Sequence, residues 1–88
     1  MSDMQPPSGG SPLRAVVEVV AKALVDHPES VKVTESDRRG MTVVSLTTAP
    51  GDMGKIIGRQ GRTAAALRTL LSVTAERHGK RAQLDIRD

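Results

Sequence analysis

The stretch that decides the fold reads Gly54-Lys55-Ile56-Ile57-Gly58-Arg59-Gln60-Gly61-Arg62-Thr63. Gly58 and Gly61 enclose Arg59 and Gln60, at the junction of a short and a long predicted helix. Glycines at such a junction allow a tight turn and a close approach of a ligand, because they carry no Cβ atom. The N–H groups that open the following helix, together with its dipole, favour anionic oxygens. This segment therefore predicts a phosphate-binding turn.

Three phosphate-binding motifs compete for this segment. A P-loop requires four residues between its glycines and then Lys with Ser or Thr, whereas three residues separate Gly54 from Gly58 and Arg59 follows. A dinucleotide-binding fingerprint requires a glycine where Ile56 stands, within a longer βαβ unit. The GXXG loop of KH domains, which clamps about four nucleotides of RNA backbone, fits residues 58–61. The alternative without a ligand is an ordinary turn between two helices.

Hydrophobic periodicity outside this segment predicts an α+β domain. The apolar residues of the first helix recur at helical spacing, and Pro28 is predicted to end that helix. The order α-β-β-α-α-β predicts a three-stranded sheet with helices packed on one face. The predicted elements are a helix over residues 13 to about 26, strands over 31–36 and 41–49 around a turn at 37–40, helices over 53–57 and 62 to about 78, and a strand over 82–87.

Several residues predict where these elements begin and end and which of their side chains are buried. Ser11 is predicted to cap the first helix, Asp52 to cap the short helix, and Gly79 to end the long helix in a left-handed conformation. Ile56 and Ile57 are predicted to divide between the core and the RNA-binding groove. The side chains predicted to point inward are Leu13, Val16, Val17, Val20 and Leu24 in the first helix, and Leu67, Leu70, Leu71 and Thr74 in the long helix.

Length and composition restrict the class of protein. The chain of 88 residues has room for one domain, which we place at 13–88, after a tail at 1–12 that is rich in Ser, Pro and Gly and is predicted to be disordered. The absence of cysteine excludes a disulfide framework and a thiol nucleophile, and the absence of Phe, Tyr and Trp excludes base stacking on those rings. No apolar run approaches the roughly 18 residues of a membrane helix, so we expect a cytoplasmic protein.

Positive charge is concentrated in residues 53–81. This segment holds seven Lys or Arg and one Glu, whereas residues 1–52 hold five basic and seven acidic residues. Such asymmetry is typical of a surface that meets phosphate, although a solvated basic helix gives the same pattern. We predict that single-stranded RNA contacts Gly54, Lys55, Ile57, Gly58, Arg59, Gln60, Gly61 and Arg62, with the backbone on the charged and polar side chains and the bases in an apolar groove beside Ile57.

The run at residues 54–63, followed by Ala66-Leu67-Arg68-Thr69-Leu70-Leu71, closely resembles the KhpA family of small bacterial proteins with a single KH domain. The resemblance covers about residues 13–87 and implies a type II KH domain. It also implies a cytoplasmic RNA-binding protein that acts as an RNA chaperone or post-transcriptional regulator. Self-association, pairing with a larger KH protein of the KhpB or Jag type, and a link to cell elongation and division are implied as well. The lack of aromatic residues predicts weak affinity and broad sequence tolerance.

Two other functions stay open on the sequence alone. The same helices are compatible with a protein–protein dimerisation module in which RNA binding is secondary, and with a ribosome-associated assembly factor that binds structured ribosomal RNA. Ser45 has no plausible His–Asp arrangement, and His27 and His78 have no cysteine partners for a metal. We therefore expect no catalytic residue, metal, cofactor, small-molecule substrate or membrane partner.

Overall fold

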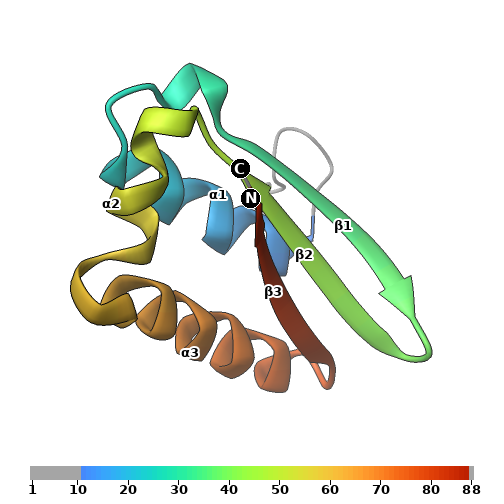
Figure 1. Cartoon of the computed structure of the whole chain (residues 1–88). Helices are drawn as coiled ribbons and strands as arrows, with labels where there is room; N and C mark the ends of the chain where they lie inside the picture. The colour runs from blue at the N-terminus through green and yellow to red at the C-terminus, as the bar shows by residue number, and fades with distance from the viewer. Residues whose placement is uncertain (1–10, 88) are drawn as a thin grey trace, which may run out of the picture.

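Helices cover one face of a three-stranded sheet in the computed structural model, which describes residues 11–87 (Figure 1). The sheet order is β1-β2-β3, with β1 antiparallel and β3 parallel to β2. This arrangement confirms the predicted α+β fold. Of the predicted tail, residues 1–10 lie outside the described residues. The elements are α1 (Pro12–Leu24), β1 (Lys32–Arg38), β2 (Met41–Thr47), α2 (Met53–Ile57), α3 (Arg62–Arg77) and β3 (Arg81–Arg87).

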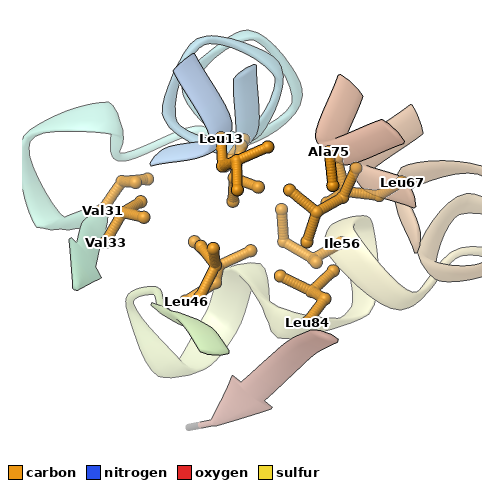
Figure 2. Close-up of a cluster of buried hydrophobic side chains, with 12 residues drawn as sticks. Leu13, Val31, Val33, Leu46, Ile56, Leu67, Ala75 and Leu84 are labelled. Atoms are coloured by element: carbon orange, nitrogen blue, oxygen red, sulfur yellow. The ribbon is translucent and has the colours of Figure 1, made fainter. Parts of the chain in front are cut away.

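The core lies between the sheet and the helices (Figure 2). Every second residue of β2 is buried, because strand side chains alternate between the helix-covered face and the open face. The core is aliphatic throughout, and burial of one Leu or Ile side chain contributes about 1.5–3 kcal/mol. Among residues 11–87, no helix combines the length and apolar character needed to cross a membrane. The largest fully buried apolar side chains are Leu13, Val17, Val44, Leu46, Ile56, Leu67 and Leu71.

Helix α1 begins where the sequence predicts and ends earlier. Ser11 Oγ accepts a hydrogen bond from a first-turn backbone N–H at 3.3 Å, and Pro12 takes the first helical position. The helix does not reach residue 26, because Val25 adopts an extended conformation and packs against the core. Pro28 therefore does not end the helix; it opens a separate turn of 3-10 helix.

The inward faces of both long helices include alanines that the apolar pattern missed. Leu70 was predicted to point inward, but it is 46% exposed, and Thr74 is only half-buried. In α1, Ala21 is buried, whereas Leu24 is exposed and Val16 is half-buried. Small side chains let a helix approach its neighbours closely, and a count of large apolar residues overlooks them. The buried residues of α3 are Ala64, Leu67, Leu71 and Ala75.

The end of α3 follows the prediction. Gly79 has a left-handed φ of +66°. Its N–H donates to the carbonyl of Glu76 at 3.0 Å, and the N–H of Lys80 donates to the carbonyl of Ala75 at 2.8 Å. These two bonds form a Schellman motif, which satisfies carbonyls that the helix end leaves open. The chain then enters β3 directly.

The hairpin between β1 and β2 is tighter than predicted. Strand β1 continues to Arg38, which pairs with Met41, so the turn contains two residues instead of four. Arg39 and Gly40 both have positive φ, +52° and +81°, as a two-residue turn of this kind requires. Strand β2 ends at Thr47, two residues before the predicted end. The turn lies far from the junction of α2 and α3 (Figure 1).

Candidate nucleic-acid interface

The glycine-flanked loop, residues 58–61, joins α2 to α3 as the sequence predicts. Ile56 has no solvent exposure and lies near Leu67 of α3 and Leu84 of β3 (Figure 2). Ile57 is 37% exposed, so Ile56 takes the core position of the predicted pair, and the groove position of Ile57 stays a prediction. Burial of Ile56 anchors the short α2, and the loop therefore projects from a fixed point at the end of the helical layer.

Gly58 is the most constrained residue of the loop. Its φ is +77°, and a Cβ atom added to it would lie 2.8 Å from the backbone nitrogen of Thr63 and closer still to the Thr63 side chain. Gly61 also has a positive φ, +75°, but an added Cβ would meet nothing within 4 Å. Thr63 therefore belongs to the framework of the loop. We did not predict this role, although its position one residue into the long helix is a visible signal.

The side chains at the tip of the loop face solvent. Arg59, Gln60 and Arg62 are exposed, and within residues 11–87 none of their side chains has a hydrogen-bond or ion-pair partner. Gln60 adopts a left-handed conformation, with φ +59° and ψ +26°. No side chain in the described part of the chain caps the N-terminus of α3, where Gly61 is the capping residue. Backbone N–H groups, the helix dipole and cationic side chains thus converge at one place.

Lys55, which is predicted to contact RNA, lies beside two acidic side chains of the same chain. Its Nζ lies 3.3 Å from Oδ2 of Asp26 and 3.8 Å from Oδ1 of Asp52. Asp52 is 2% exposed and accepts a hydrogen bond from the backbone N–H of His27 at 2.9 Å. It makes no capping hydrogen bond to α2, so that prediction was wrong. The buried carboxylate instead fastens the linker between α1 and β1 to the start of α2.

Gly54 presents bare backbone on α2. Its conformation is helical, and an added Cβ would meet nothing within 4 Å. Glycine inside a helix destabilises by about 0.5–1 kcal/mol relative to alanine, so the fold gains nothing from it. The exposed backbone is open to close approach by a ligand.

Two adjoining hollows run between α3 and the edge strand β3. The first, of about 260 Å³, is lined by Arg68 and Ser72 of α3 and by Leu84 of β3, among others. The second, of about 230 Å³, includes Lys80. Ile57 lines neither of these two hollows. The groove predicted beside Ile57 stays a prediction, and the sequence pattern gave no signal for the hollows, because they form where two distant segments meet.

The element order, the parallel pairing of β2 with β3 and the GXXG turn between α2 and α3 define a type II KH domain. Within that class, the chain belongs to the KhpA/KhpB KH-domain family, whose model matches residues 14–86. The family expected from the sequence is thereby confirmed.

Curated relatives are similar over nearly their whole length. RNA-binding protein KhpA of Halalkalibacterium halodurans is 46% identical over 76 residues, which cover 86% of this chain and 100% of that protein. RNA-binding protein KhpA of Aquifex aeolicus is 45% identical over 76 residues, covering 86% and 96%. The protein of the same name from Treponema pallidum is 45% identical over 73 residues, covering 83% and 91%.

Two solved structures share the fold. Era of Aquifex aeolicus bound to GDP and AlF4⁻ superposes with a TM-score of 0.60 at 19% identity, covering 88% of this chain and 31% of Era. Era in complex with MgGDPNP and nucleotides of 16S ribosomal RNA superposes with a TM-score of 0.61 at 18% identity, covering 98% and 35%. This chain thus spans about a third of each Era chain, and the likeness concerns the fold alone.

Alanine substitution of the three glycines separates their roles. We expect Gly58→Ala to lower the free energy of unfolding most, by more than about 2 kcal/mol, because it combines strained φ with a clash. Gly61→Ala should cost about 1 kcal/mol, for φ alone. Gly54→Ala should be neutral or stabilise by up to about 1 kcal/mol. Chemical denaturation checks the order, and equal losses at Gly58 and Gly61 would contradict the assigned contact with Thr63.

Proposed function

We propose that this chain binds single-stranded RNA through residues 58–61. The observation that carries the proposal is the turn in which Arg59 and Gln60 face solvent at the uncapped N-terminus of α3. The curated relatives are named RNA-binding proteins, which supports the same ligand for this chain. Phosphate is the chemical group that such a turn recognises best.

The proposed contacts divide by chemistry. A phosphate lies against the first N–H groups of α3, where Gly58 and Gly61 leave no Cβ atom in its path. Arg59 and Arg62 supply positive charge, and the amide of Gln60 donates a hydrogen bond. Contacts of this kind position the RNA backbone without reading its bases, so we expect binding across many sequences.

The bases are proposed to rest on aliphatic surface. Ile57 offers apolar area beside the loop, and the hollow lined by Arg68, Ser72 and Leu84 offers further space along α3. Stacking on an aromatic ring contributes about 1–3 kcal/mol per base, and this chain has no Phe, Tyr or Trp. Each base is therefore held weakly, which suits a chaperone or post-transcriptional regulator that must exchange RNA partners in the cytoplasm.

A second surface supports pairing with another copy of the chain. Val16, Val19 and Val20 of α1 and Leu70 of α3 line a shallow apolar hollow of about 340 Å³, and Val19 is 68% exposed. Two copies that meet through this face would bury it symmetrically. The family model covers both KhpA and KhpB, so a KhpB or Jag-type protein is the proposed alternative partner, with cell elongation and division as the process served. This patch is also the observation that favours a dimerisation module as the second candidate function.

The RNA-binding proposal is tested by Arg59→Asp combined with Gln60→Asp. Both side chains are exposed, and aspartate tolerates the left-handed conformation at position 60, so the fold should persist. Repulsion of phosphate should weaken binding of an unstructured RNA at least about tenfold, equivalent to about 1.4 kcal/mol. The wild type should lose affinity with salt at a log–log slope of about −2 for three neutralised phosphates.

The matched control combines Arg39→Asp with Arg38→Gln, which lowers the net charge by the same amount at the turn between β1 and β2. It should bind RNA nearly as the wild type does. Equal binding by the folded loop variant and the wild type would contradict the proposal, as would equal losses in the loop variant and its control.

Self-association is tested by Val19→Lys, which places a charge in the apolar hollow without touching the core. We expect the wild-type melting temperature to rise with protein concentration, because association stabilises the folded state. Val19→Lys should remove that dependence and yield monomers in sedimentation. Ser45→Lys, on the open face of the sheet, is the control that should still associate. A wild type that is monomeric at high micromolar concentration would contradict the dimer.

A further inference from the structure

Lys55 lies one helical turn before the GXXG loop. The N–H of Gly58 donates to the carbonyl of Gly54 at 2.8 Å, so the helical bonding of α2 continues up to the loop. Lys55 and Gly58 are three residues apart, about 4.5 Å along the helix axis, and residues at this spacing are neighbours on a helix surface. The flexible side chain of Lys55 can therefore reach a phosphate that residues 58–61 hold.

Lys55 already pairs with two acidic residues, and these differ in solvent exposure. Asp52 is 2% exposed and is fixed by the N–H of His27, so it belongs to the folded framework. The side chain of Asp26 is 70% exposed, sits on the linker after α1, and approaches Lys55 Nζ to 3.3 Å. On the same linker, Glu29 lies 3.5 Å from Nδ1 of His27 and not on Lys55. Asp26 is thus the carboxylate that can leave Lys55 without disturbing the core.

We propose that Asp26 competes with the RNA phosphate for Lys55 and thereby limits the affinity of the GXXG loop. This inference rests on the proposed function of residues 58–61. In the free protein the carboxylate of Asp26 holds the ammonium group of Lys55. When RNA binds, a phosphate oxygen replaces that carboxylate, and Asp26 turns to solvent. Asp52 keeps its bond to the linker throughout, so the exchange changes one exposed ion pair and leaves the fold intact.

The effect of this competition on RNA affinity is limited by the strength of the Asp26–Lys55 ion pair. An exposed ion pair contributes little, about 0.2–1 kcal/mol, so its removal should raise RNA affinity by about 1.4- to fivefold. In the wild type, added salt also weakens the competing Asp26–Lys55 pair and so offsets part of the loss of RNA affinity, and removal of the Asp26 charge abolishes this offset. The log–log salt slope should therefore become more negative by up to about 0.7, the value for one phosphate of a single strand.

The test is a fluorescence titration of a labelled oligouridine with the full chain at several salt concentrations. The proteins compared are the wild type, Asp26→Asn, Lys55→Gln and the double variant. Asp85→Asn is the matched control, because Asp85 also pairs with a basic side chain, Arg87 at 2.8 Å, on the open face of the sheet. We expect Asp26→Asn to bind about 1.4- to fivefold tighter than the wild type, with a steeper salt slope, and Asp85→Asn to show neither change.

The double variant decides whether the effect passes through Lys55. Binding of the Asp26→Asn, Lys55→Gln protein no tighter than that of Lys55→Gln supports the competition. An equal gain in both backgrounds overturns it, because Asp26 would then act on RNA directly. Unchanged affinity in Asp26→Asn, with RNA still lost on Arg59→Asp and Gln60→Asp, overturns the competition alone. Absence of RNA binding by the wild type overturns the proposed function and this inference with it.

Discussion

The contact between Gly58 and Thr63 sets the angle between α2 and α3, and the rest of the candidate interface depends on it. Gly58 has a positive φ, and no Cβ atom fits between its backbone and Thr63. Burial of Ile56, the penultimate residue of α2, holds the same short helix in the core. Arg59 and Gln60 lie in the loop that the close approach of Gly58 and Thr63 closes, so they are presented at the loop tip without help from a ligand. The RNA binding that we propose then requires little ordering of the protein, which preserves affinity in a chain that has no Phe, Tyr or Trp.

The charges around this loop are not equivalent. Arg59 and Arg62 face solvent without a partner in the described part of the chain, whereas Lys55 is held between an exposed and a buried carboxylate. A uniformly basic surface would bind polyanions tightly and release them slowly. A surface on which one cation pairs with a carboxylate of the same chain binds polyanions more weakly. Its affinity also changes when that ion pair is broken. The phosphate contacts and aliphatic base contacts that we propose favour broad, reversible association with RNA.

The sequence was most informative where a residue type has one physical use. The GXXG spacing located the loop, Ser11 and Gly79 located helix ends, and the order of elements predicted the sheet and its helical layer. It was less informative where small residues, or contacts between segments distant in the sequence, determine which side chains are buried or paired. In α3, alanines occupy buried positions and Leu70 lies on the surface, contrary to the apolar pattern. Asp52 had the position of a cap but bonds to the linker instead, and the approach of Asp26 to Lys55 depends on tertiary contacts that no local pattern encodes.

The most direct test of the central claim follows the backbone amides themselves. In two-dimensional ¹H–¹⁵N NMR, a short unstructured RNA is added stepwise to the labelled protein, and each amide signal is tracked. Our account predicts that the amides of residues 58–63 shift first and saturate together, while those of Arg39 and Gly40 at the distant hairpin stay in place. Shifts confined to the apolar surface around Val19 and Leu70, with residues 58–63 unchanged, would contradict it.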